Sequence, residues 1–407
     1  LCARKVQPDD DITDMESMED NLIFLGMVGI MDPPRAEVYD AIDRCQKAGI
    51  AVKMITGDQQ MTAQAIGEDL NITKPHIDSV GGEKLEELDD DAMRHIVNGT
   101  AIFSRVTPEQ KMRIVTALQD EGEVVAMTGD GVNDAPALSR ANIGISMGIA
   151  GTDVAKDASD MVLQDDNFAN IVNAVEEGRK IYANIRNFVR YQVSTNVAAV
   201  ALLLLANVVF QLPLPLTATQ ILVINILMDG PPAVALGVER KHANVMDRPP
   251  RAVDESLPNL LDLLLIFYLG AVMVTGTLLV YYLALQNGTE AYAQTMCFSV
   301  FIVFQLFNVM NCRSNEHSVF KLGLFSNRAI YLAVFFSITL LLLVVQGAAI
   351  VIPFTSFAIG ELLSTIPLEQ KDWFIIILVA STVFMVEEFR KLLRYAGIFR
   401  VRTNKRA

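Results

Sequence analysis

The sequence predicts an α/β unit with a parallel sheet, followed by an all-α bundle of six membrane-spanning helices. In residues 1–186, short apolar runs alternate with amphipathic stretches of helical spacing, the order that builds parallel sheets. In residues 187–395, apolar runs reach the ~20 residues that a helix needs to cross a bilayer. Hydrophobic residues make up 52% of the chain, so both water and lipid shape the fold. Residues 396–407 form a basic tail, expected to be cytoplasmic.

The elements of the first unit follow one another at short intervals. Strands are expected at residues 22–30, 51–55, 101–104 and 123–127. Helices are expected at residues 36–48, 61–69 and 108–120. Parallel sheets place their chemistry at the carboxyl ends of the strands. The residues directly after each strand are therefore the first candidates for a site.

Six membrane spans are expected in the second half, at residues 189–210, 216–237, 259–285, 293–311, 329–350 and 372–393. The connections after the second and fourth spans and the C-terminal tail are basic, whereas residues 211–217 and 286–292 contain no Lys or Arg. By the positive-inside rule, we expect the first unit and the C-terminus to be cytoplasmic. Both the plasma membrane and a secretory-pathway membrane fit this pattern.

The bulk composition argues against several classes of protein. The net charge of −14 disfavours nucleic acid as a partner, because phosphate binding needs clustered Lys and Arg. The four cysteines are scattered, without the spacing of a zinc site or a disulfide framework. The chain begins with Leu1 and shows nothing like a signal peptide, so we expect an incomplete polypeptide.

Two predicted strands end in the same three-residue motif, and the second copy of this motif continues into a longer run rich in turn residues. The two copies are Thr56-Gly57-Asp58 and Thr128-Gly129-Asp130-Gly131-Val132-Asn133-Asp134-Ala135-Pro136. Glycines after a strand let backbone N–H groups approach a phosphate, and carboxylates such as Asp130 and Asp134 suit Mg²⁺. Lys111, on the helix expected at 108–120, offers the positive charge that phosphoryl transfer needs. A single Asp-Gly pair is typical of a plain turn, but the repetition favours a phosphate site.

These residues closely resemble the phosphorylation domain of P-type ATPases, which has the haloacid-dehalogenase fold. The resemblance extends over Asp32-Pro33-Pro34-Arg35, Asp165-Asp166-Asn167-Phe168 and the membrane half, which is nearly the whole chain. It implies that Asp130 binds Mg²⁺ and that Asp134 supports the Mg²⁺ site. It also implies phosphate contacts, ATP contacts or catalytic roles for Thr56, Gly57, Asp58, Arg105, Lys111 and Asn133.

Other parts of that family's machinery are missing from the sequence. It contains no Asp-Lys-Thr-Gly motif, which carries the phosphorylated aspartate, and no Thr-Gly-Glu-Ser motif. The family's nucleotide-binding domain is missing as well. We therefore expect the chain to need the N-terminal portion of a pump as its partner and to be inactive alone.

Polar residues inside the apolar spans predict an ion site, because they are costly in lipid and mark pathways. Asn225 and Asp229 are four residues apart, on one helical face, directly before Gly230-Pro231-Pro232. The prolines are expected to break the helix and to free carbonyls as ligands. Oxygen ligands of this kind suit Ca²⁺, and also Mn²⁺. Ser194, Thr195 and Asn196 add oxygens in the first span.

Other polar residues of the spans are weaker indications of an ion site. Hydrogen bonding between helices is an alternative for Asn225 and above all for Asn196. Gln305 in the fourth span is ambiguous. The remaining acidic residues lie near the span ends and are expected to extend to the membrane interface: Asp262, Glu387 and Glu388.

Residues 224–232 resemble the sixth transmembrane helix of calcium pumps, and the six spans resemble their helices five to ten. Two-site pumps of the sarcoplasmic-reticulum type have Glu, Thr and Glu where this chain has Ala199, Met228 and Gln305. The pattern therefore resembles single-site pumps of the secretory pathway and of bacteria. This resemblance implies one Ca²⁺ per cycle at Asn225, Asp229 and Asn196, completed by a glutamate from the missing portion.

Three alternatives stay open at this point. A truncated, non-catalytic membrane protein could act as a binding or regulatory subunit, and a pump could carry Mn²⁺ or a monovalent cation. A membrane-anchored phosphatase is disfavoured, because it needs its own nucleophilic aspartate and has no use for Asp229. In a pump, the helix with Asn187 and Tyr191 is expected to run on from the soluble unit as a lever towards the ion site.

Overall fold

The computed structural model describes residues 2–6, 13, 19, 22–28, 33–74, 79–240, 245–253, 255–351 and 358–396. Asp32, the loop residues 241–244 and the tail from residue 397 onward, all used in the sequence analysis, lie outside this range. The chain divides into two compact units. Unit 1 consists of Leu1–Arg44 and Ala51–Ala169, and unit 2 of Cys45–Ile50 and Asn170–Ala407.

Unit 1 contains parallel strands arranged as two small sheets. One has the order β3-β5-β4, with β3 at Met54–Ile55, β5 at Ile102–Ser104 and β4 at Val80–Gly81. The other has the order β6-β7-β8, with β6 at Ala126–Gly129, β7 at Ile143–Met147 and β8 at Met161–Leu163. Every pairing in both sheets is parallel, as predicted, but the strands do not form one continuous sheet.

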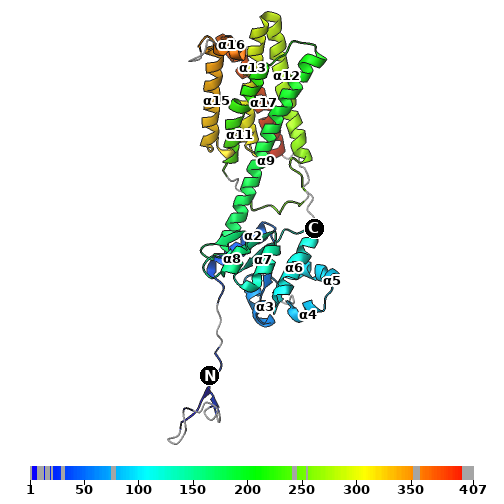
Figure 1. Ribbon diagram of the computed structural model, residues 1–407, viewed down its shortest axis with the longest axis vertical. Coiled ribbons are helices and arrows are strands. Elements are labelled where there is room, and N and C mark those ends of the chain that lie inside the picture. The colour runs from blue at the N-terminus through cyan, green and yellow to red at the C-terminus, as the bar shows by residue number, and fades with distance from the viewer. Residues whose placement is uncertain are drawn as a thin grey trace. The chain divides into compact units, whose positions relative to one another are not determined.

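Helices alternate with these strands (Figure 1), and apolar side chains of the two pack into shared clusters. Their bounds are α2 Ala36–Lys47, α3 Gln60–Asp69, α4 Gly82–Glu86, α5 Asp90–Gly99, α6 Pro108–Asp120, α7 Ala135–Arg140 and α8 Asp153–Asp157. Helix α6 begins with a complete capping box, in which Thr107 and Gln110 satisfy each other's backbone N–H groups. Ile55 of β3 packs against the same apolar cluster as Met127 of β6. The carboxyl ends of β3 and β6 therefore rest on one core.

Three predicted strands differ from the structure by more than one residue, and the run at 51–55 is a strand only over β3 (Met54–Ile55). The run at 22–30 contributes only β2 (Ile23–Phe24), which pairs antiparallel with β1 (Cys2–Ala3) and is exposed, so it has no core face to join. The strand expected at 123–127 is observed at 126–129. The reason lies further along the chain, because Asn142 binds both backbone groups of Val125: its side chain accepts from Val125 N at 2.9 Å and its N–H donates to Val125 O at 3.0 Å.

Unit 2 is a bundle of long helices. They are α9 Ala169–Leu204 with a π turn η2 Leu205–Val209, α10 Ala218–Val223, η3 Ile224–Met228, α11 Gly230–Gly237, α12 Leu260–Asn287, α13 Glu290–Cys312, α14 Val319–Leu322, α15 Arg328–Gln346, α16 Ile359–Leu363 and α17 Gln370–Tyr395. Helix α13 packs between α12 and α17 and is largely buried (Figure 1).

Within the described residues, five helical stretches are long and apolar enough to cross a membrane, where six were predicted. The sixth prediction corresponds to α17, a 26-residue helix. Charged residues near both of its ends, among them Asp372 and Glu387, leave a shorter apolar centre. Helix α9 is continuous over 36 residues, as expected for the lever helix. The expected boundary after residue 186 therefore falls inside α9, whereas the two units divide after Ala169.

Candidate functional sites

In unit 1, the loop after β6 is organised around the carboxylate of Asp134. Asp134 Oδ2 accepts hydrogen bonds from the backbone N–H groups of Asp130 and Gly131, both at 3.2 Å. Asp134 Oδ1 pairs with Lys111 Nζ at 2.6 Å. A Cβ at Gly129 would stand 2.4 Å from Asp134 Cβ, so only glycine lets the loop close this tightly. The loop thus fixes the lysine and two backbone donors around one buried acid.

The loop after β3 carries the other copy of the three-residue motif. Thr56 Oγ1 accepts from Asp58 N at 3.1 Å, and Thr56 N donates to Phe103 O at 2.9 Å on the neighbouring strand β5. Arg105 N donates to Asp58 O at 3.1 Å, and Arg105 adopts a left-handed backbone conformation with φ 51°. The side chains of Asp58 and Arg105 are exposed at this edge. They are free to meet a ligand that arrives from solvent.

Of the two carboxylates in the loop after β6, that of Asp130 is available to bind Mg²⁺ and that of Asp134 is not. Asp130 is exposed, and no described residue bonds to its carboxylate, while its backbone is anchored at both N and O. Mg²⁺ usually keeps several waters and takes one or two carboxylates together with phosphate oxygens. Asp130 fits that demand. Asp134 does not offer a free ligand, because its oxygens are engaged with Lys111 and the loop backbone. Asn133 is exposed beside them.

Two further sequence motifs lie in contact in the structure. Arg35 Nη1 donates to Asp166 O at 2.8 Å, so the Pro-Pro-Arg motif and the Asp-Asp-Asn-Phe motif lie in contact. The Asp166 carboxylate accepts from Ile149 N at 3.0 Å and Ala150 N at 2.8 Å. These backbone donors, that of Ile149 foremost, lower the pKa of Asp166 because they stabilise its charged form. Arg35 and Asp166 therefore both help to hold the turn after β7.

In unit 2, Asp229 is completely buried among polar side chains from other helices. Tyr191 Oη of α9 donates to Asp229 Oδ1 at 3.1 Å, and Gln305 Nε2 of α13 donates to Asp229 Oδ2 at 3.4 Å. Asn308 Nδ2 donates to Ser194 Oγ at 2.9 Å in the same buried layer. The Gln305 Oε1 atom is buried without a partner among the described residues. An unpaired acceptor next to a carboxylate is suited to a cation.

The helix around Asp229 is widened rather than broken, which corrects the prediction from the two prolines. Asp229 N donates to Ile224 O at 2.9 Å, five residues back, so residues 224–228 form a π turn. Helix α11 then continues with Pro231 and Pro232 in its first turn, where missing N–H groups cost least. Ser337 Oγ donates to one of the freed carbonyls, Met228 O, at 3.3 Å.

The other two predicted membrane ligands lie differently. Asn225 and Asn196 are both exposed on the described helices, whereas Asp229 is buried. Among the described residues, the side-chain hydrogen bonds to the Asp229 carboxylate come from Tyr191 and Gln305 and not from these two asparagines. Thr195 is buried, and its hydroxyl donates to Gln192 O at 3.0 Å within α9.

The acidic residues near the helix ends form ion pairs with basic side chains. Asp262 and Glu387 are at most 2% exposed and form ion pairs with Arg186 and Arg390, at 2.8 Å and 2.7 Å. Glu388 pairs with the buried Lys391 at 3.2 Å. Burial among other helices is tolerated because each charge has a partner.

The comparisons with known proteins cover both units. A family model described as haloacid dehalogenase-like hydrolase matches residues 5–142, and one described as cation transporting ATPase, C-terminus, matches residues 213–393. Calcium-transporting ATPase 1 of Schizosaccharomyces pombe is 44% identical over 392 residues, which are 94% of this chain and 42% of that protein. The chain therefore belongs with the cation-transporting ATPases.

Other calcium-transporting ATPases match in the same way. The human type 2C member 1 is 47% identical over 325 residues, 80% of this chain and 35% of that protein. The Bacillus subtilis enzyme is 43% identical over 367 residues, 89% of this chain and 40% of its own length. The chain thus spans about two fifths of the length of the curated relatives that it matches.

For a cation-transporting ATPase, sequence reasoning missed several residues around Asp229. The sequence predicts Tyr191 only as part of a lever helix and singles out neither Asn308 nor Ser337. A tyrosine or asparagine in an apolar helix is a signal for a buried hydrogen bond. The partner of that bond lies on another helix, so helical spacing alone does not identify it.

Proposed function

We propose that this chain is the C-terminal part of an ATP-driven pump that moves Ca²⁺ across a membrane through an aspartyl-phosphate intermediate, one ion per cycle. The observation that carries the proposal is Asp229, a carboxylate completely buried in an apolar helical bundle with Tyr191 and Gln305 as partners. A buried membrane carboxylate is costly and marks an ion pathway. The calcium-transporting relatives make Ca²⁺ the first choice of ion.

The phosphoryl-transfer half of the proposal rests on unit 1. A carboxylate oxygen from the N-terminal portion of the pump would attack the γ-phosphorus of ATP, and ADP would leave. Lys111, held by Asp134, would face the transferred charge, and Asp130 would hold the Mg²⁺ that neutralises the phosphate oxygens. Thr56, Asp58, Arg105 and Asn133 would contact phosphate or nucleotide.

The strand arrangement supports a contribution from another segment. Among the described strands, β3 pairs only with β5, and β6 pairs only with β7, so each has one unused edge. Both strands end in the Thr-Gly-Asp motif and rest on one apolar cluster through Ile55 and Met127. A parallel strand that carries the phosphorylated aspartate would satisfy these edges.

The ion site would also be completed by the N-terminal portion. Asn225 and Asn196 expose their amides on the described helices, and an exposed amide is costly in lipid. A further helix that covers them would add ligands to the Asp229 site. We further propose that unit 1 and the C-terminus are cytoplasmic, from the basic connections of the sequence.

The test is ion transport by the complete pump that contains this chain, reconstituted in sealed vesicles. We expect ATP-dependent Ca²⁺ uptake with about one Ca²⁺ per ATP hydrolysed, because Ala199, Met228 and Gln305 stand where two-site pumps have Glu, Thr and Glu. A ratio near two contradicts the single-site proposal. Uptake of Mn²⁺ or a monovalent cation in place of Ca²⁺ contradicts the ion assignment.

A further inference from the structure

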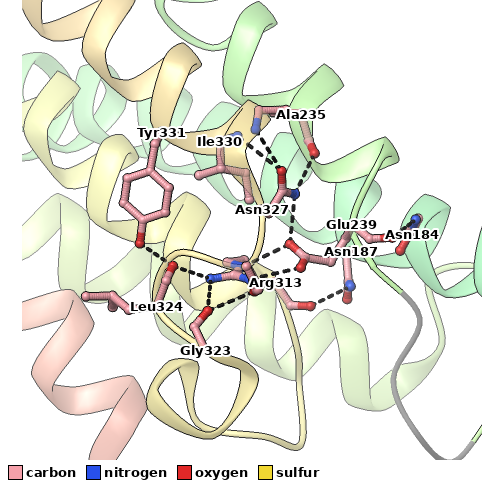
Figure 2. A network of polar contacts seen from close by, with 12 residues as sticks. Asn184, Asn187, Ala235, Glu239, Arg313, Gly323, Leu324, Asn327, Ile330 and Tyr331 are labelled. Carbon is pink, nitrogen blue, oxygen red and sulfur yellow. Dashed lines mark hydrogen bonds and ion pairs between the residues drawn. The ribbon is translucent and has the colours of Figure 1, made fainter.

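A buried ion pair lies just beyond the ends of two membrane helices. Arg313 directly follows α13, and Glu239 follows α11 by two residues. Arg313 Nε and Nη2 donate to the two Glu239 carboxylate oxygens, both at 2.9 Å. Their side chains are 0% and 2% exposed. Figure 2 shows the guanidinium lying between this carboxylate and the Gly323 and Leu324 carbonyls.

The guanidinium of Arg313 has no unused donor. Nη1 donates to Gly323 O at 3.3 Å and to Leu324 O at 3.1 Å, and Nη2 donates also to Ser326 Oγ. Asn327 Nδ2 donates to Glu239 Oε2 at 3.0 Å from the start of α15. In a fully satisfied buried pair, any displacement leaves a charge uncompensated. The pair is therefore a rigid joint between α11, α13 and α15.

Helix α9 holds the backbone of both members of this joint. Asn184 Nδ2 donates to Gly237 O at 3.0 Å and to Glu239 O at 3.1 Å. Asn187 Nδ2, one turn further along α9, donates to Arg313 O at 2.9 Å (Figure 2). The two asparagines thus fasten α9 to the ion pair through the main chain.

The same two helices meet again at the proposed cation site. Tyr191 lies one further turn along α9 and donates to Asp229, which precedes the first residue of α11. Helix α11 has 8 residues, Gly230–Gly237, and is attached to α9 at both ends. Near the Glu239 end, Asn327 Nδ2 also holds Ala235 O at 3.1 Å. A displacement of the Glu239 end of so short a helix is transmitted to Asp229.

We propose that Glu239 and Arg313 are positioning residues for the divalent-cation site at Asp229. The inference rests on the proposed role of Asp229 as a ligand. The pair touches no cation. It fixes the far end of α11 against α9 and the loop before α15, and thereby sets the position of the Asp229 carboxylate. Loss of the pair weakens cation binding without removing a ligand.

The test uses Glu239→Gln in the complete pump, because this change keeps the size of the side chain and removes its charge. Two reactions are measured. One is Ca²⁺-dependent phosphorylation by ATP. The other is phosphorylation by inorganic phosphate without Ca²⁺, which needs the soluble site with its Mg²⁺ but no Ca²⁺ at Asp229. We expect the half-saturating Ca²⁺ concentration to rise about 10-fold, as for loss of a supporting partner of a metal ligand. Phosphorylation by inorganic phosphate should be unchanged.

Two further variants sharpen the test. Arg313→Lys keeps the charge but loses the two-pronged geometry, so we expect a smaller rise in the same direction. Glu316→Gln is the matched control, because Glu316 lies in the same loop but pairs with Arg248 and Arg394. It should leave the Ca²⁺ dependence unchanged.

Each remaining outcome decides against the inference. A half-saturating Ca²⁺ concentration within about twofold of the unmodified pump in Glu239→Gln overturns it. A joint loss of both phosphorylation reactions gives the pair a role in folding alone and overturns it too. Asp229→Asn is measured in parallel. If Asp229→Asn keeps normal Ca²⁺ dependence, the proposed cation site itself is wrong. If Asp229→Asn changes the Ca²⁺ dependence and Glu239→Gln does not, only the positioning role is refuted.

Discussion

The two candidate sites are built in opposite ways. In unit 1, Asp58, Arg105 and Asp130 are exposed at the ends of strands, and tight loops arrange them through backbone hydrogen bonds. In unit 2, Asp229 is buried, and its partners Tyr191 and Gln305 come from two other helices. An exposed charge is supported by water, while a buried charge needs partners from the protein.

This difference reflects what each site has to receive. In the proposed pump, a nucleotide and its Mg²⁺ would arrive from solvent, which fits the exposed side chains of Asp58, Arg105 and Asp130 beside the Lys111–Asp134 pair. In the same proposal, a cation inside a bilayer would exchange its hydration shell for protein oxygens, which fits a buried Asp229 with partners from two other helices. The following predictions test whether the two sites respond separately.

The largest expected effect separates the sites completely. Asp130→Asn should abolish phosphorylation by ATP and by inorganic phosphate in the complete pump, because the Mg²⁺ ligand is lost, a loss of at least about 100-fold. Ca²⁺ binding at equilibrium should persist. The control Asp153→Asn removes an exposed acid from α8 in the same unit and should leave phosphorylation normal. Retained phosphoenzyme in Asp130→Asn contradicts the Mg²⁺ role.

The converse change should affect the ion alone. Asp229→Asn should raise the Ca²⁺ concentration needed for phosphorylation by ATP by more than the roughly 10–100-fold that loss of a supporting partner costs. Phosphorylation by inorganic phosphate should remain. Asp372→Asn is the matched control, because Asp372 is a buried carboxylate of the same unit and also accepts from a tyrosine, Tyr292, at 2.7 Å. An equal effect of both variants would mean that the site is not specific to Asp229.

A smaller effect is expected from the partner of Asp229. Tyr191→Phe removes one hydroxyl and leaves the aromatic ring in place, so we expect about a 10-fold higher half-saturating Ca²⁺ concentration. Tyr281→Phe removes a hydroxyl that donates to Pro213 O at 2.9 Å, elsewhere in the bundle, and serves as the control. Unchanged Ca²⁺ dependence in Tyr191→Phe would show that the hydroxyl does not orient the carboxylate.

The smallest effect compares the two Thr-Gly-Asp motifs of unit 1. Gly129→Ala should destabilise the unit by about 1–3 kcal/mol, because the added Cβ would stand 2.4 Å from Asp134 Cβ. Gly57→Ala is the matched control, since a Cβ there meets nothing within 4 Å. The measurement is protease susceptibility of the full chain across a urea series. Equal midpoints for the two variants would show that the loop after β6 tolerates a wider turn.

Much of unit 1 could be predicted, since its information is local. Helix α6 begins and ends as predicted, at Pro108–Asp120, because Thr107 and Gln110 make a capping box within four residues of sequence. The motif Thr128–Pro136 predicts the turn that contains Asp130 and Asp134. The prediction failed where distant residues decide: Asn142 displaces the start of β6, and β2 (Ile23–Phe24) finds a partner only in β1.

The sequence by itself determined where the two Thr-Gly-Asp motifs of unit 1 lie. It also determined that Asp229 is the candidate ion-site residue of the membrane half and that α9 is one long helix. Only the tertiary structure decided which groups surround Asp229, and that the Asp134 carboxylate is held by Lys111 and the loop backbone. It alone paired Asp262, Glu387 and Glu239 with arginines and buried them. The physical reason is that helical spacing specifies which side of a helix is apolar, whereas the partner of a buried charge is selected by packing between helices.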